Sequence, residues 1–323
     1  MKVKSSVPSR PVPAGSAPLC PAPAFDGNGG ITTLLLDRNG HRLVQLDWAP
    51  GRALSDTELV LNGAVPDEIG VAVSVGRGML IADYEDNVFT INRITGGCYR
   101  LGRFDVPMTF APDGTRLVTA DDKGLTSAAI DWDYAGRALV GAARRVLTAD
   151  LDPVSLVVLP RNRPRQYDIA IGCYGWVELV TLEDADASGI PASRRSISAP
   201  EYLVYDPIFV SAVGKISPAI RGPWVYATDE GGTGLIAINR TSDLAEGYPR
   251  DEVAYGSIRE AVPASDAASC LIRTGSGTWT CWIPGTAPLA VEVPNGRILA
   301  WSGRYALVLD LEGTIVREVD LAG

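Results

Sequence analysis

Residues 36–49 read LDRNGHRLVQLDWA, and residues 309–322, near the other end of the chain, read LDLEGTIVREVDLA. The two stretches align without a gap. Each is typical of a strand, a tight turn and a second strand, because an apolar run is broken by turn-forming residues and then resumes. Looser copies of this hairpin lie at 89–100, 129–140, 235–239 and 278–282. Self-similarity at a period of ~40 to 50 residues in a strand-rich chain indicates a β-propeller.

A second repeated unit precedes most of these hairpins. It is an apolar strand that ends in a small or acidic residue and runs into a turn that usually contains glycine. Its copies lie at 80–86, 117–124, 169–175, 225–231 and 299–303. From Ile31 to Val319 the pattern gives roughly 26 candidate strands, which at four strands per blade makes six or seven blades. We therefore predict an all-β fold, a β-propeller of seven blades with six as the alternative, in which the two termini meet in one blade.

One copy of the repeat carries a recognisable signature. Phe110-Ala111-Pro112-Asp113-Gly114 leads into the apolar run Leu117 to Ala120. This order resembles the strand-turn-strand signature of WD40-like and YVTN-like propeller repeats. The chain lacks the regularly spaced Gly-His and Trp-Asp dipeptides of true WD40 repeats. The resemblance therefore implies a fold, and it assigns no binding or catalytic residue.

Composition sets the expected domain organisation and the expected partners. Residues 1–30 are rich in Pro and Ala and have no apolar periodicity, so we expect a disordered leader or an extended arm, followed by a single propeller domain over 31–323. The net charge of −9 disfavours nucleic acid and anionic membranes. No apolar run reaches the length of a membrane span. We expect a soluble, cytoplasmic protein that binds neither nucleic acid nor a membrane.

The candidate site follows from the position of the second repeated unit. In a propeller, the turns between the second and third strands of the blades gather around the mouth of the central channel on one face. If the second unit supplies those turns, its side chains line the mouth, together with Cys173 and Ser302. The candidate ligand-binding residues are Asp83, Tyr84, Glu85, Asp121, Asp122, Lys123, Tyr174, Trp176, Asp229, Glu230 and Arg304.

These residues predict an acidic, aromatic-lined mouth that binds a small molecule or a protein partner. Clustered oxygen ligands suit hard cations, so calcium is the one cofactor that such a rim suggests, and aromatic walls suit cationic ligands. The alternative function is a cofactor-independent enzyme, a lyase, hydrolase or cyclase, that uses the same carboxylates. A third interpretation is structural, because Asp and Gly are the residues that tight turns use.

Histidine and cysteine content limits the chemistry further. His41 is the only histidine, so a His-based metal centre or a Ser-His-Asp triad is not expected. Its turn should lie opposite the mouth, unless the N-terminal strands belong one position earlier in their blade. The sequence contains no CxxC pair, so a zinc site is not expected. Cys270 and Cys281 flank a hairpin in which a two- or four-residue loop would place them opposite each other, so a disulfide between them is an alternative to two free thiols. We expect the tryptophans to pack between blades.

Overall fold

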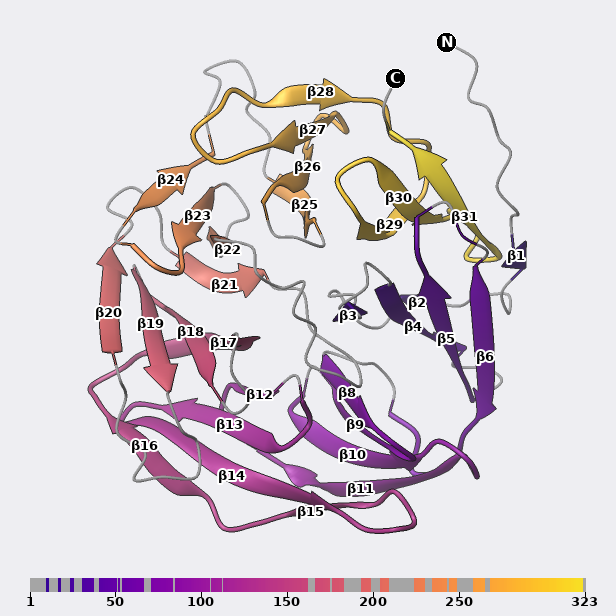
Figure 1. Ribbon diagram of the computed structural model, residues 1–323, viewed down its shortest axis with the longest axis vertical. Coiled ribbons are helices and arrows are strands. Elements are labelled where there is room, and N and C mark those ends of the chain that lie inside the picture. The colour runs from indigo at the N-terminus through magenta and orange to yellow at the C-terminus, as the bar shows by residue number, and fades with distance from the viewer. Residues whose placement is uncertain are drawn as a thin grey trace.

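The structure of the protein is a computed structural model. It describes residues 10–11, 17–18, 24–25, 31–37, 41–50, 52, 54–66, 71–83, 85–104, 106–111, 113–161, 166–174, 176–182, 193–198, 204–208, 224–229, 234–242, 244–248, 258–264 and 268–321. These residues form seven small sheets arranged in a ring (Figure 1). The protein is a seven-bladed β-propeller, which confirms the predicted fold and the predicted number of blades.

Each blade is one sheet, in which the strands follow one another from the inner to the outer edge. Blade 1 contains β2 (Ala17–Pro18) and β3 (Ala24–Phe25), which both pair with β4 (Ile31–Asp37), then β5 (Arg42–Trp48) and β6 (Ser55–Val60). Blade 2 contains β8 (Val71–Val75), β9 (Gly78–Ala82), β10 (Asn87–Asn92), β11 (Gly97–Arg103) and β7 (Asn62–Gly63). Blade 3 contains β12 (Met108–Phe110), β13 (Arg116–Asp121), β14 (Gly124–Trp132), β15 (Ala138–Val140) and β16 (Arg144–Thr148). Both β15 and β16 pair with β14.

The remaining four blades have four strands each. Blade 4 contains β17 (Pro153–Pro160), β18 (Tyr167–Cys173), β19 (Trp176–Leu182) and β20 (Ser193–Ser198). Blade 5 contains β21 (Val204–Ile208), β22 (Trp224–Asp229), β23 (Leu235–Asn239) and β24 (Ala245–Gly247). Blade 6 contains β25 (Ile258–Pro263), β26 (Cys270–Thr274), β27 (Trp279–Trp282) and β28 (Leu289–Val291). Blade 7 contains β29 (Arg297–Trp301), β30 (Tyr305–Leu309), β31 (Ile315–Asp320) and β1 (Arg10–Pro11).

The core lies between the blades. Seven hydrophobic clusters each join two neighbouring blades, from the cluster of blades 1 and 2 round to that of blades 7 and 1. The middle strands of the blades are covered on both faces, so β9 and β18 are buried along their whole length. Burial of both faces explains why polar and apolar residues do not alternate along these strands. All seven tryptophans belong to these clusters, which confirms their expected role: Trp48, Trp132, Trp176, Trp224, Trp279, Trp282 and Trp301.

The two chain ends close the ring in blade 7. Arg10 pairs with Val316 and Pro11 with Ile315, so β1 is the outermost strand of a blade whose other strands come from the C-terminal end (Figure 1). β2 and β3 then form the inner edge of blade 1. Proline lacks the N–H of an interior strand, and β1 and β2 place theirs at sheet edges. Six residues of the expected leader are thus paired strand, and the termini meet in one blade as predicted.

The repeated hairpins at the two ends lie in neighbouring blades. They are β4–β5 of blade 1 and β30–β31 of blade 7. They meet at the seam of these blades, where the indole Nε1 of Trp48 donates to a carboxylate oxygen of Glu318 at 2.5 Å. The matching sequences therefore reflect equivalent positions in successive blades, and the seam between them closes the ring.

Cys270 and Cys281 face opposite sides of blade 6. The strand register pairs Cys270 with Trp282 and Leu271 with Cys281. The hairpin has a three-residue loop, which ends at Gly277 with a φ of +85° and in which the Gly277 N–H donates to Thr274. The two- and four-residue loops expected for this hairpin are both wrong by one residue. Both thiols are free, Cys270 against blade 5 and Cys281 against blade 7.

The propeller has two faces, distinguished by their turns. We letter the strands of a blade a to d from the inner edge outward. Because consecutive strands are antiparallel, the b–c turns lie on one face, named the b–c face, and the a–b and c–d turns lie on the other, named the c–d face. Within the described part of the chain, no helix has the length and apolarity to span a membrane.

Candidate functional site

Three consecutive blades bring predicted site residues to the b–c face. Asp83 and Glu85 lie in the turn of blade 2, Asp122 and Lys123 follow Asp121 in the turn of blade 3, and Tyr174 and Trp176 border the turn of blade 4. Tyr84, Glu230 and the side chain of Asp229 lie outside the described residues. The structure thus places most of the described candidates on one face.

Arg304 is the exception. It lies in the turn between β29 and β30, the a and b strands of blade 7, and so belongs to the c–d face, as does Ser302. Its guanidinium forms an ion pair with Asp320 at 2.8 Å. The prediction was wrong because β1 supplies the d strand of this blade, which makes the last three strands of the chain a, b and c. The b–c turn of blade 7 contains Asp310 instead.

His41 was also assigned to the wrong face. β4 and β5 are the b and c strands of blade 1, because β2 and β3 precede them, so His41 lies at the end of a b–c turn. This is the alternative left open for it from the sequence. His41 is exposed, with a φ of +49°, and its backbone carbonyl accepts the N–H of Leu61 at 2.7 Å. These observations give it a role in the turn.

Two of the predicted carboxylates bind their own turns. Asp83 accepts the backbone N–H of Glu85 at 2.9 Å and that of Asn87 at 2.8 Å. Asp121 accepts the backbone N–H of Lys123 at 3.0 Å and pairs with both terminal nitrogens of Arg145. The Arg145 hydrogen bond is the main reason that the pKa of Asp121 is lowered. Asp83 and Asp121 therefore have the structural role that aspartate commonly has in tight turns.

The side chains that face solvent form a smaller set. Glu85, Asp122 and Lys123 are exposed, and the Tyr174 residue is 48% exposed. Trp176 is half-buried in the seam of blades 3 and 4. Among the described residues, no group of three or more His, Cys, Asp or Glu residues is placed to hold a metal ion, and calcium binding stays a prediction.

The described thiols are poorly suited to nucleophilic catalysis. Cys173, the candidate nucleophile at the mouth, is buried, and desolvation raises its pKa to about 11. Burial raises the pKa of Cys98 to about 12, and it also raises those of Cys270 and Cys281. A reactive cysteine needs a depressed pKa, and the pKa of each of these four thiols is raised instead.

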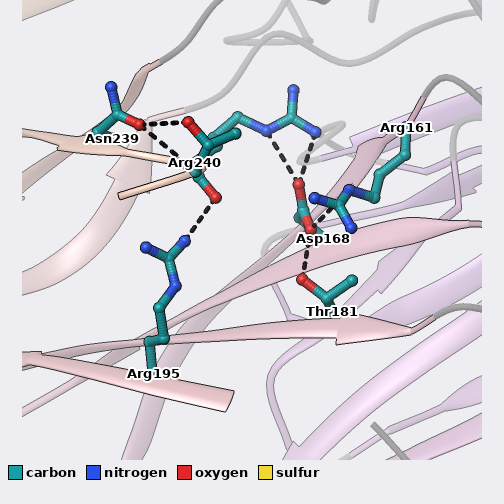
Figure 2. A network of polar contacts seen from close by, with 7 residues as sticks. Arg161, Asp168, Thr181, Arg195, Asn239 and Arg240 are labelled. Atoms are coloured by element: carbon teal, nitrogen blue, oxygen red, sulfur yellow. Dashed lines mark hydrogen bonds and ion pairs between the residues drawn. The ribbon is translucent and has the colours of Figure 1, made fainter. Parts of the chain in front are cut away.

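A buried polar network that the sequence pattern does not predict lies on the c–d face. Asp168 is 1% exposed, and Figure 2 shows it between the guanidiniums of Arg161 and Arg240. The Arg240 Nη2 lies 2.9 Å from one carboxylate oxygen, while Arg161 Nε at 3.3 Å and Thr181 Oγ1 at 2.7 Å reach the other. Arg195 donates to the Arg240 carbonyl. Since Asp168 belongs to blade 4 and Arg240 to blade 5, the network joins two blades.

A second contact of this kind explains the Pro-Asp-Gly signature. Asp113 accepts the Thr115 N–H at 3.0 Å and, through its other oxygen, the hydroxyl of Tyr167 in blade 4. Gly114 has a φ of +67°, and a Cβ there would lie 2.2 Å from Cγ2 of Val75 in blade 2. The signature turn therefore contacts both neighbouring blades, which accounts for its residue types without a ligand.

Comparison with known proteins supports the fold. No family model matches the chain, and no curated protein matches it in sequence. It is similar to the crystal structure of the Cps50 (Swd1) β-propeller domain of Myceliophteria thermophila, with a TM-score of 0.59 and 12% identity over 97% of this chain and 99% of that one. It is also similar to YCF48 bound to D1 peptide, with a TM-score of 0.52 and 12% identity over 97% of this chain and 96% of that one.

Proposed function

Because the chain is a WD40-like β-propeller of seven blades, we propose that it is a binding module that holds a protein partner on the b–c face of blades 2 to 4. The observation that carries this proposal is the division of the turn side chains into two sets. Asp83 and Asp121 hold the turns, while Glu85, Asp122 and Tyr174 project from them into solvent. The exposed set is the binding surface.

Preorganised turns favour binding. A side chain on a fixed backbone loses less conformational entropy when a partner binds than one on a loop that must first become ordered. The Asp83 and Asp121 hydrogen bonds fix two of the turns that carry exposed side chains. Exposed Tyr supplies apolar area with a polar tip, which is typical of residues at the centre of protein interfaces.

Charge indicates the kind of partner. Arg145 is paired with Asp121, so the exposed charges of these turns are Glu85 and Asp122 against Lys123. The chain as a whole carries a net charge of −9. A partner segment with basic side chains is therefore favoured, both on contact and in the approach to the surface. YCF48 offers a precedent, since its structure was solved with D1 peptide bound.

The enzyme hypothesis has less support. Cys98 and Cys173 are buried and have raised pKa values, and two of the turn carboxylates bind backbone amides. A small-molecule ligand at the central mouth also lacks a specific observation in its favour. Both stay alternatives to the protein-binding proposal.

The proposal is tested with a dye-labelled basic peptide and a neutral peptide of equal length, by fluorescence anisotropy. The wild type is expected to prefer the basic peptide. Tyr174→Ala should raise its Kd more than about fivefold, the loss expected for an interface tyrosine. Tyr134→Ala is the matched control, because Tyr134 is fully exposed in the c–d turn of blade 3. Equal effects of the two substitutions would refute the proposal.

Removal of one charge tests the acidic part of the surface. Asp122→Asn should raise the Kd about two- to fivefold, since an exposed ion pair contributes about 0.2–1 kcal/mol. Asp131→Asn is its control, because Asp131 is exposed at the opposite end of β14 in the same blade. If Asp131→Asn weakens binding as much as Asp122→Asn, only the net charge matters and the b–c face is not the site.

A further inference from the structure

A row of three side chains crosses blade 6 on the side that faces blade 7. Glu260 of β25 pairs across the sheet with Arg273 of β26, and Arg273 pairs with Trp279 of β27. Trp279 packs in the cluster that joins blades 6 and 7. Arg273 comes just before the b–c turn of blade 6, and Arg297 begins β29, the inner strand of blade 7. The seam therefore brings two arginines and one carboxylate to the b–c face, on the far side of the ring from blades 2 to 4 (Figure 1).

Arg273 is held in place and still has a donor to offer. Its guanidinium carbon lies 5.8 Å from the centroid of the Trp279 ring, a cation–π distance that fixes the side chain against the indole. Its Nε is buried and has no hydrogen-bond partner among the described residues. A buried N–H without an acceptor destabilises the fold, and native proteins keep few of them. The guanidinium of Arg273 therefore keeps hydrogen-bonding capacity that the described residues do not use.

Glu260 does not supply that acceptor. Its carboxylate accepts the backbone N–H of Ile298 in blade 7, and desolvation raises its pKa although Arg297 and Arg273 act in the opposite direction. Among the ion pairs of the described residues, none joins Glu260 to either arginine. Glu260 thus lies within electrostatic reach of both arginines, while its carboxylate accepts the Ile298 N–H.

The charges of the three groups select the ligand. Two guanidiniums beside one carboxyl group leave a net positive charge at the seam, which favours an anionic ligand. A guanidinium also matches a carboxylate with two parallel hydrogen bonds. We propose that the seam of blades 6 and 7 is a carboxylate-binding site, formed by Arg273 and Arg297 beside the indole of Trp279.

This site is separate from the surface proposed for a basic partner, since it takes a ligand of opposite charge through other blades. The carboxylate could belong to an acidic side chain of a peptide or to a free organic acid. Two probes distinguish these sources: a capped pentapeptide with one central glutamate, and succinate. Both are measured by isothermal titration calorimetry in ~0.15 M salt, where the Debye length of about 8 Å screens the distant negative charge of the chain.

Substitution of the arginines and substitution of Glu260 should change the Kd in opposite directions. Arg297→Gln and Arg273→Gln should each raise the Kd of the better probe about tenfold, the loss expected for one charge-assisted hydrogen bond. Glu260→Gln should lower it severalfold, because it removes a like charge and its amide oxygen can still accept the Ile298 N–H. Arg317→Gln, an exposed arginine of β31, is the control and should leave the Kd unchanged.

The controls decide the outcome. The glutamine version of the pentapeptide should bind at least about tenfold more weakly than the glutamate version if the peptide is the ligand; tighter binding of succinate would point to a free acid, and either result supports the site. Equal losses from Arg317→Gln and Arg297→Gln, inorganic phosphate that binds more tightly than both probes, or no binding of either probe would overturn the proposal. If Arg273→Gln does not fold, the exposed Arg297 carries the test alone. None of these results bears on the basic-peptide experiment.

Discussion

Two aspartates on each face of the propeller have different roles. On the b–c face, Asp83 and Asp121 bind the amides of their own turns and remain partly exposed. On the c–d face, Asp168 is buried and pairs with Arg240 of the next blade, and Asp113 accepts the Tyr167 hydroxyl of the next blade. The c–d face therefore helps to hold blades 3, 4 and 5 together, while the described turns of the b–c face support themselves.

This difference matters for function. Side chains that join blades are constrained by the fold, and their loss should reduce stability. Side chains that project from self-supporting turns can change with little effect on the ring, so the b–c face is the one on which a binding surface can be varied. Substitutions on the two faces should separate these roles.

Asp168→Asn should have the largest effect. The substitution leaves the Arg240 guanidinium, which is 8% exposed, without its ionised partner. Breaking a buried ion pair by removing one charge costs about 3–5 kcal/mol. Urea unfolding followed by circular dichroism measures the loss. Asp131→Asn makes the same chemical change at an exposed site and should leave stability within about 0.5 kcal/mol of the wild type. A loss under about 1 kcal/mol from Asp168→Asn would show that the network does not hold blades 4 and 5 together.

Tyr167→Phe should have an intermediate effect. It deletes the hydroxyl that bonds to Asp113 and lies 3.3 Å from Thr115 Oγ1, and it leaves the ring in the seam of blades 3 and 4. The loss of a hydrogen bond to a charged partner should lower the free energy of unfolding by about 1.5–3 kcal/mol. The same denaturation experiment measures it. Unchanged stability would mean that the signature turn does not depend on its contact with blade 4.

The fold could be predicted because repetition and apolar runs are local signals. The two repeated units and the strand count predicted seven blades with six as the alternative, and the apolar run in residues 169–171 lies within the buried strand β18. The positions of His41 and Arg304 could not be predicted for one shared reason. β1, β2 and β3 are two residues long and lie in a Pro-rich segment, so no apolar run marks them, and the strand count was off by one at both chain ends.

The candidate site was predicted less well because its chemistry depends on distant contacts. The charge of Asp168 within an apolar strand was a signal, but its partner Arg240 lies 72 residues further along the chain. Similarly, Arg273 and Arg297 belong to different blades. An aspartate in a turn looks the same in sequence whether it binds a ligand or its own backbone, and only the positions of the Glu85 and Lys123 amides distinguish the two for Asp83 and Asp121.

Arg145→Gln should have the smallest effect on stability, and it tests the b–c face directly. Because Arg145 lowers the pKa of Asp121 below its ordinary value, this pair stabilises the fold above the ordinary aspartate pKa, and the contribution is lost as the pH falls through the lowered value. The pair is partly exposed, so the loss at neutral pH should stay below about 1 kcal/mol. A carboxyl-detected NMR titration should show the Asp121 pKa rising in the variant, although the Lys123 N–H still holds it down in part.

Asp310 provides the internal control for that titration. Its pKa is lowered chiefly by the backbone N–H of Thr314 in the b–c turn of blade 7, with no arginine among the causes, so Arg145→Gln should leave it unchanged. A rise at both aspartates would indicate a general change in the fold. A rise at neither would mean that the turn amide alone sets the Asp121 pKa, and that aspartates on this face bind only their own turns. A rise at Asp121 alone would show that Arg145 affects the pKa of one turn aspartate and leaves the other turns of this face unchanged. Such independence is what allows side chains on the b–c face to vary without loss of the ring.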